Sequence, residues 1–224
     1  MKSAKGLIPA WLTNGFVKII MPMVHVFVKL KLSPNFFTTL GFLITTSATV
    51  VLFIDPKYIH WFGLLVLLGG ICDVIDGKLA RTAGRSTKFG ALYDSSLDRY
   101  SEVIMFFGIA AYYVRHDSYL LSVMSFIALG GSMMVSYIRA RAEGLGFTAK
   151  VGWMQRAERV VIIGFAALLN VDLFKITMFH VQNYSVTLLD LAIWTVAIFA
   201  NVTALQRLYY VYVLDKSQTL KEES

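Results

Sequence analysis

Four aspartates in two closely spaced pairs are the residues of this chain best suited to chemistry. Asp73 and Asp76 are three positions apart, and Asp94 and Asp98 are four positions apart. Residues at these spacings lie on one face of a helix, so two helix ends brought together would converge four carboxylates. Carboxylates are hard oxygen ligands for Mg²⁺, Mn²⁺ or Ca²⁺, and two such ions about 4 Å apart can bridge phosphate oxygens. The spacing therefore predicts a divalent metal site that acts on phosphate groups.

The segment between the two pairs contains residue types that suit a phosphate ligand. Glycines let a ligand approach the backbone, and a guanidinium matches phosphate geometry. The whole stretch reads D-x2-D-G-x2-A-R-x8-G-x3-D-x3-D, with its fixed positions filled by Asp73, Asp76, Gly77, Ala80, Arg81, Gly90, Asp94 and Asp98. This pattern resembles the signature of the CDP-alcohol phosphotransferase family, membrane enzymes that make phospholipid head groups. The resemblance implies a phosphatidyl transfer from CDP-diacylglycerol to an alcohol, with release of CMP.

The resemblance also implies roles for individual residues. Two Mg²⁺ or Mn²⁺ ions would be held by Asp73, Asp76, Asp94 and Asp98. Asp98 either completes this metal site or acts as the catalytic base that takes the proton from the attacking hydroxyl. The CDP-lipid would be bordered by Pro34, Asn35, Thr38, Gly77, Ala80, Arg81 and Gly90. A simple helix start is the other interpretation of the P-N-x-x-T segment.

A second basic cluster runs from Ser136 to Arg159. Arginine binds phosphate with two parallel hydrogen bonds, whereas any cation would satisfy membrane topology alone. The family resemblance implies that the acceptor phosphate is held by Arg139, Arg141, Arg159 and Arg207, and a purely topological role is the other interpretation of the basic cluster. The pattern Y-I-R-A-R-A-E followed by R-A-E-R resembles the branch of the family that transfers to inositol phosphate. Inositol phosphate is therefore the expected acceptor, with glycerol 3-phosphate, as used by phosphatidylglycerophosphate synthases, or another phosphorylated polyol as the alternative.

Composition predicts an all-α polytopic membrane protein. Hydrophobic residues make up 57% of the chain, charged residues 16%, and the mean hydropathy is +0.63. A span needs about 20 apolar residues. Six spans are predicted at 36–54, 58–77, 89–114, 119–138, 160–178 and 186–206. The expected organisation is an amphipathic interfacial helix in residues 1–33, a catalytic domain in 34–214 and a cytoplasmic tail in 215–224.

The distribution of positive charge predicts the orientation. Of 21 basic residues, 17 lie in segments 1–33, 78–88, 139–159 and 207–221, and the opposite connections hold Lys57, Arg115 and Lys175. Lysine and arginine concentrate on the cytoplasmic side of membrane proteins. Both termini and the aspartates are therefore expected to be cytoplasmic, in what the resemblance implies is a prokaryotic inner membrane. The same bias accounts for the high pI without a nucleic-acid partner.

Three other functions also place aspartates among apolar helices. A transporter or divalent-cation channel would need polar groups along a path, and no inverted repeat is evident. An aspartate-rich prenyltransferase would need a second such motif after Asp98, and this sequence has none. A structural scaffold would explain the spans but not the eight-position pattern. The enzyme interpretation is preferred, and the resemblance implies a homodimer.

Overall fold

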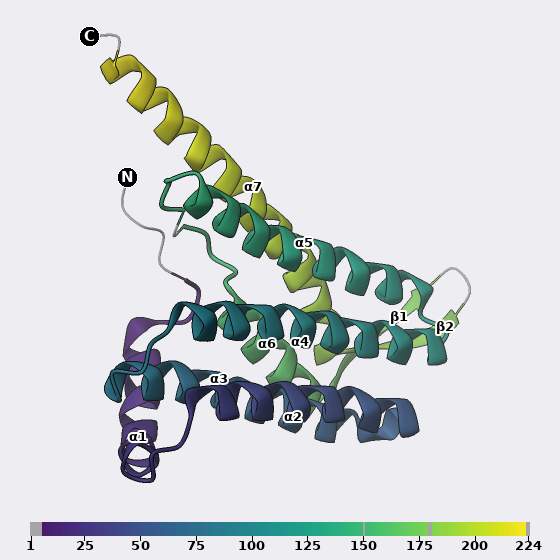
Figure 1. Ribbon diagram of the computed structural model, residues 1–224. Helices are drawn as coiled ribbons and strands as arrows, with labels where there is room; N and C mark the ends of the chain where they lie inside the picture. The colour runs from purple at the N-terminus through teal and green to yellow at the C-terminus, as the bar shows by residue number, and fades with distance from the viewer. Residues whose placement is uncertain (1–5, 150, 179–180, 223–224) are drawn as a thin grey trace.

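The computed structural model describes residues 6–149, 151–178 and 181–222 (Figure 1). Three lysines that were counted in predicting the orientation lie outside these residues: Lys2, Lys5 and Lys150. The elements in order are α1 (Ala10–Lys29), α2 (Pro34–Ile54), the short 3-10 helix η1 (Pro56–Tyr58), α3 (Ile59–Thr82), α4 (Lys88–Arg115), α5 (Tyr119–Gly144), α6 (Arg156–Leu169), β1 (Asp172–Met178), β2 (Val181–Thr187) and α7 (Leu188–Glu222). The fold is thus mostly helical, as predicted.

Five helices of the described chain are long and apolar enough to cross a membrane: α1, α2, α3 with η1, α5 and α7. They identify an integral membrane protein. The third predicted span corresponds to α4, which is 28 residues long but charged in and just after its first half, at Asp94, Asp98, Arg99 and Glu102. A bundle interior or a wet cavity is the usual place for such charges.

The fifth predicted span is wrong in its second half. Helix α6 ends at Leu169, and Asp172–Met178 instead forms an antiparallel hairpin with Val181–Thr187. Asn170 ends the helix with φ of 26°, a left-handed conformation that asparagine tolerates. The charged Asp172 and Lys175 then interrupt the apolar run that had suggested a longer helix. With 14 residues, α6 is shorter than a regular membrane span.

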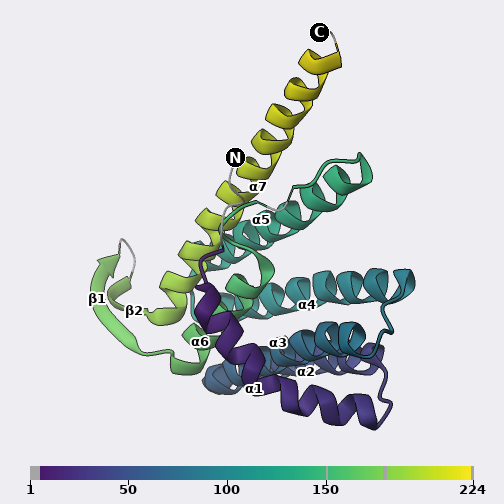
Figure 2. The same ribbon diagram turned by 90° about the vertical axis from the view of Figure 1, so that its left-hand side faces the viewer.

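Helix α1 differs from the others in direction and exposure. It runs across the direction of α2, α3 and α4 in both views (Figure 1, Figure 2). Its buried residues, Ile20 and Val24, pack in a small apolar cluster with Phe37, Ile75 and Leu79. Most of its other large apolar side chains are exposed. This is the pattern expected of an amphipathic helix at a membrane surface.

Glycines allow α3 and α6 to pack at close range. A Cβ built on Gly63 would lie 2.6 Å from the carbonyl oxygen of Gly164, and one on Gly70 would lie 3.0 Å from Val160. Small residues of this kind let helix backbones approach in membrane proteins. The contacts run in opposite chain directions, and their continuation brings Asp73 of α3 opposite Arg156, the first residue of α6.

Helix α7 is longer than the predicted sixth span, 186–206. It also continues past residue 214, where the catalytic domain was predicted to end. It continues as one helix to Glu222, and its C-terminal part projects beyond the bundle (Figure 1, Figure 2). Its start is fixed by a reciprocal cap, in which the Thr187 backbone N–H donates to Asp190 and the Asp190 N–H donates to the Thr187 hydroxyl. Tyr113 of α4 also donates to Asp190, at 2.7 Å. These contacts fix α7 against α4.

Candidate active site

The two aspartate pairs come together near the end of α3 and the start of α4, which a short connection joins. Asp76 is six residues before the end of α3, and Asp94 is six residues after the start of α4. Because the helices are antiparallel, these equal offsets bring both residues to the same level. Asp73, Asp76 and Asp94 each offer a carboxylate oxygen, and these oxygens lie within 4.8 Å of one another. The predicted convergence is confirmed for these three.

The three carboxylates fit a divalent cation. One oxygen of Asp94, Oδ1, is buried and has no protein hydrogen-bond partner. Asp76 is 4% exposed, and its Oδ2 accepts a 2.6 Å hydrogen bond from the Thr38 hydroxyl. That bond holds the carboxylate in a fixed orientation, as outer partners of metal ligands commonly do. Such closely spaced, partly buried carboxylates repel one another unless a cation lies between them.

Close packing of α2 on α3 places Thr38. A Cβ built on Gly41 would lie 3.1 Å from the Gly69 carbonyl oxygen, and one on Gly69 would lie 3.1 Å from that of Gly41. The two helices therefore touch through their backbones. One turn away, Thr38 of α2 reaches Asp76 of α3.

Asp98 lies outside the group of three and is joined to it by Arg156. The Arg156 guanidinium contacts Asp73 Oδ1 through Nη1 and Asp98 Oδ1 through Nη2, both at 2.8 Å. A small cavity lined by Thr38, Asp73, Asp76, Asp98 and Arg156 among others places these groups around one space. Sequence reasoning had placed Arg156 in the second basic cluster but had not assigned it to the site. Its position in R-A-E-R at the start of a helix was the available signal.

A second cavity, of about 170 Å³, adjoins the aspartates on the side of the α3–α4 connection. All seven residues predicted to border the CDP-lipid line it: Pro34, Asn35, Thr38, Gly77, Ala80, Arg81 and Gly90. Asp76 and Asp94 also line it, so the cavity and the carboxylate cluster share a wall. The binding role of these residues stays a prediction, but they form one space.

Sequence reasoning missed other residues of this cavity, among them Arg85, Ser86 and Thr87. The Thr87 hydroxyl accepts a 2.9 Å hydrogen bond from the Gly90 N–H and caps α4. Arg85 donates to the carbonyl oxygens of Lys31 and Leu32, just after α1. A threonine before an apolar helix was a recognisable cap signal. The contact between Arg85 and the end of α1 had no signal in the sequence.

The four arginines predicted for the acceptor occupy different environments. Arg159 is fully buried, and its guanidinium bonds Glu102 at 2.7 to 2.8 Å and the Met154 carbonyl oxygen at 2.9 Å. Arg207 is 3% exposed and donates to the carbonyl oxygens of Val151 and Val135. Both side chains thus bind the protein itself and hold the connection before α6.

The other two predicted arginines lie on α5. Arg139 forms an ion pair with Glu143 at 3.0 Å, and Arg141 is exposed. Arg139 and Arg159 lie within electrostatic range of Arg207, as does Arg99, which sequence reasoning had not included. Positive charge is therefore concentrated around Arg207, and one member of this group, Arg99, directly follows Asp98 in the chain; Arg141 is not among the members. The acceptor role of all four stays a prediction.

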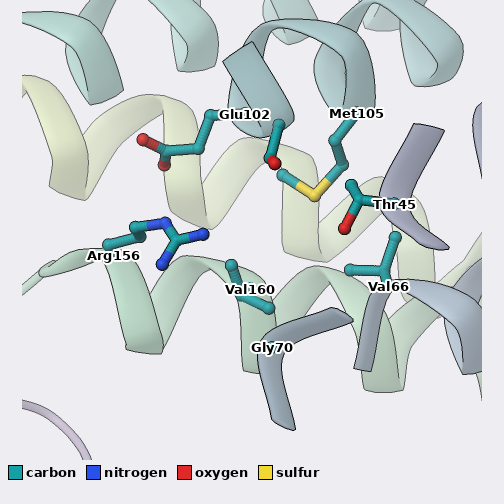
Figure 3. A pocket seen from close by; sticks show the side chains of 8 residues that line it. Thr45, Val66, Gly70, Glu102, Met105, Arg156 and Val160 are labelled. Carbon is teal, nitrogen blue, oxygen red and sulfur yellow. The ribbon is translucent and has the colours of Figure 1, made fainter. Parts of the chain in front are cut away.

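A small cavity of about 10 Å³ lies behind Arg156, between α2, α3, α4 and α6. Figure 3 shows the Arg156 guanidinium directed toward it, with the Glu102 side chain above Arg156 among the residues that line the cavity. Glu102 is 1% exposed and also pairs with Arg99, which in turn donates to the Ser136 hydroxyl. Glu102 is therefore the centre of a buried ion network next to the aspartates.

Comparison with known proteins agrees with this geometry. Residues 31–201 match the family model described as CDP-alcohol phosphatidyltransferase. The chain belongs to this family. An archaetidylinositol phosphate synthase of Pyrococcus horikoshii is 35% identical over 81% of this chain and 84% of the relative. A phosphatidylinositol phosphate synthase of Streptomyces avermitilis is 31% identical over 92% of this chain and 83% of the relative.

Solved structures of the family resemble the fold. The Mycobacterium tuberculosis phosphatidylinositol phosphate synthase with CDP-DAG bound has a TM-score of 0.71 and 27% identity, over 87% of this chain and 94% of that one. The same enzyme with manganese and citrate has a TM-score of 0.71 and 28% identity, over 85% and 88%. Family membership makes this chain a phospholipid-synthesising transferase, in place of the transporter, channel and prenyltransferase alternatives. Together with the aspartate cluster, the manganese-bound relative indicates a divalent metal site.

Proposed function

We propose that this protein transfers a phosphatidyl group from CDP-diacylglycerol to inositol phosphate and releases CMP. The observation that carries the proposal is the shared wall between the cavity and the carboxylate cluster, formed by Thr38, Asp76 and Asp94. A diphosphate held there would have its nucleotide side in the cavity and its reacting phosphorus beside the aspartates. The CDP-DAG named for the tuberculosis relative supports this donor.

The residues of the site fit a direct displacement. A divalent metal, of which we propose two ions, would supply charge neutralisation and polarisation of the diphosphate when bound by Asp73, Asp76 and Asp94. Asp98 would accept the proton of the acceptor hydroxyl as that oxygen forms its bond to phosphorus and the bond to CMP breaks. Arg81, which lines the cavity, would bind the donor's phosphate oxygens.

The acceptor is inferred from charge and from the relatives. The cluster of Arg99, Arg139, Arg159 and Arg207 concentrates positive charge, and Arg99 directly follows Asp98 in the chain, which favours an acceptor that carries phosphate. The Pyrococcus and Streptomyces relatives are both named as synthases of an inositol phosphate lipid, and the two names differ only in the lipid part. Glycerol 3-phosphate remains the second candidate because it presents the same charged group.

The membrane arrangement is part of the proposal. The positive charge of 78–88 and 139–159 supports a cytoplasmic site, and α1 is suited to lie in the same interface. We further propose a homodimer in a prokaryotic inner membrane, as the resemblance implied. Water-soluble CDP and acceptor groups would then reach the site from the compartment that supplies nucleotides.

The decisive experiment is a product assay. Purified protein in detergent is incubated with CDP-diacylglycerol, Mg²⁺ and either inositol phosphate, glycerol 3-phosphate or free inositol, and the lipid product is identified by mass spectrometry. Phosphatidylinositol phosphate is expected, together with equimolar CMP. If phosphatidylglycerophosphate alone forms when both phosphorylated acceptors are present, the acceptor is glycerol 3-phosphate and not inositol phosphate. CMP release that persists with excess chelator would remove the metal from the mechanism.

A further inference from the structure

Arg156 occupies the position at which a cation is needed. Its two terminal nitrogens each contact a different aspartate, Asp73 of α3 and Asp98 of α4, both at 2.8 Å. The guanidinium therefore links the two aspartate pairs. Arg156 begins α6, and a helix N-terminus adds its own partial positive charge. This end of α6 stabilises a group of carboxylates that would otherwise repel one another.

The neighbouring arginines have other partners. Arg159, one turn further along α6, pairs with Glu102 and is 0% exposed. Arg99 also pairs with Glu102. Among the ion pairs of the described residues, those to Asp73 and Asp98 both come from Arg156. Its role toward the cluster is therefore separate from the Glu102 network.

The Arg156 side chain is partly exposed where it contacts the aspartates. It is 19% exposed, in contrast to the fully enclosed Arg159. Its Nε is buried without a hydrogen-bond partner, so part of the guanidinium is unsatisfied where it now lies. The cavity of about 10 Å³ beside it is large enough for about one water, and Ser101 and Glu102 are the polar residues of α4 among those that line it. Figure 3 shows the guanidinium at the edge of this space.

We propose that Arg156 is an internal counter-ion of the aspartate cluster, which a divalent metal displaces from Asp73 and Asp98 when it binds. The inference rests on the metal site proposed above. Asp73 is both an ion-pair partner of Arg156 and a member of the three-carboxylate group, so the two cations compete for it. Displacement breaks both ion pairs of the guanidinium and leaves Asp98 free to accept the acceptor's proton. Arg156 thus keeps Asp98 inactive until the metal is bound.

Metal binding without substrates tests this competition. Wild-type protein and Arg156→Gln are titrated with Mn²⁺ by calorimetry, and their melting temperatures are measured with and without the ion. Removing a competing cation strengthens metal binding and weakens the metal-free protein, so about tenfold tighter Mn²⁺ binding is expected. The melting temperature falls in the metal-free state and recovers to near wild type when Mn²⁺ is saturating. Arg156→Lys keeps the charge, so its Mn²⁺ affinity and its metal-free melting temperature are expected to lie between those of wild type and Arg156→Gln.

Arg99→Gln is the matched control, because Arg99 is a nearby cation whose ion pair, among the described residues, is with Glu102 instead of an aspartate. Its loss lowers the melting temperature equally with and without Mn²⁺ and changes Mn²⁺ affinity much less than loss of Arg156. Equal effects of the two substitutions, or unchanged affinity in Arg156→Gln, overturn the counter-ion role while leaving the metal site intact. Wild-type protein that binds no Mn²⁺, or binding that survives Asp76→Asn, overturns the metal site and this inference together.

Discussion

At the residue scale, the aspartates depend on neighbours that orient them. Thr38 donates to Asp76 at 2.6 Å and holds one carboxylate, while the guanidinium of Arg156 spans Asp73 and Asp98. A carboxylate fixed before metal binding loses less freedom on binding than a mobile one. The chemistry of the site therefore belongs to the aspartates together with these two partners.

Replacing Thr38 by valine should weaken metal binding and leave the fold intact. Valine has the same shape but cannot donate to Asp76, and a hydrogen bond to a charged group contributes about 1.5–3 kcal/mol. A loss of roughly tenfold in Mn²⁺ affinity is expected by calorimetry, with a parallel rise in the Mg²⁺ concentration needed for activity. Thr38→Ser keeps the hydroxyl and should retain most of the affinity. Equal behaviour of the two variants would assign Thr38 to packing alone.

Asparagine substitutions at the carboxylates should abolish transfer without unfolding the protein. Asp76→Asn and Asp94→Asn each remove a charged metal ligand, and a loss well beyond tenfold, or about 1.4 kcal/mol, is expected. The double variant should be little worse than either single one, since the ligands act as a unit. Activity is followed by CMP release and folding by circular dichroism. If both single variants keep more than about a tenth of activity, the shared metal site is refuted.

Arg159 should matter for stability as well as for the acceptor. Its guanidinium is one of two cationic partners of the buried Glu102, so Arg159→Ala leaves that carboxylate with the half-buried Arg99 alone, at a cost approaching the roughly 3–5 kcal/mol of a broken buried pair. A clear fall in melting temperature is expected in detergent, and adding Glu102→Gln should restore part of it. A rise in acceptor KM at unchanged melting temperature would instead support a role confined to phosphate binding.

At the element scale, close helix contacts set the geometry of the site. The glycine contacts of α3 with α2 and α6 bring Thr38 to Asp76 and Arg156 to Asp73. The α3–α4 connection between Thr82 and Lys88 is short, so the aspartates on either side meet at one level. Small residues in the helices therefore position charged ones one or two turns away.

Gly63→Ala should disturb the site from a distance. The added Cβ meets the backbone of α6 around Gly164, which cannot move aside as a side chain would, and overpacking of this kind typically costs about 1–3 kcal/mol. Both a lower melting temperature and reduced transfer are expected. Gly130→Ala on α5 is the matched control, because nothing lies within 4 Å of its added Cβ. If the two variants behave alike, close α3–α6 packing is unnecessary for the site.

At the scale of the whole molecule, the polar site lies at one end of an apolar bundle. The α3–α4 connection and α1 lie at this end, and the β1–β2 hairpin lies at the opposite one (Figure 1). Arg115 and Lys57 are near the hairpin's end, whereas the arginines of the site are near the other. This arrangement separates a membrane-embedded body from one face that handles charged substrates.

Cysteine labelling in intact cells should establish the orientation. In a Cys72→Ala background, Ser217→Cys on α7 is expected to react with a membrane-permeant maleimide and not with an impermeant one, because the positive charge predicts a cytoplasmic C-terminus. Lys57→Cys, at the opposite end and well exposed, should react with both reagents. The reverse pattern would place the nucleotide cavity outside the cell and refute the proposed topology.

The sequence by itself determined the family, the helical membrane class, and which residues meet in the carboxylate cluster and in the adjoining cavity. These features follow from local spacing, since Asp73 and Asp76 share a helix face and seven residues of two short motifs line one cavity. The error in the fifth predicted span also had a local origin. The apolar run after Val160 matched a helix by composition, and periodicity alone does not separate a buried helix from a strand.

Only the tertiary structure decided which charges face one another. Arg156 and Arg159 are three residues apart in the same motif, yet one contacts the aspartates and the other is enclosed with Glu102. Their partners lie on α3 and α4, more than fifty positions away for every pair, and the glycine contacts of α3 set the register that joins them. Long-range register depends on how whole helix surfaces fit together, which no spacing within one segment encodes.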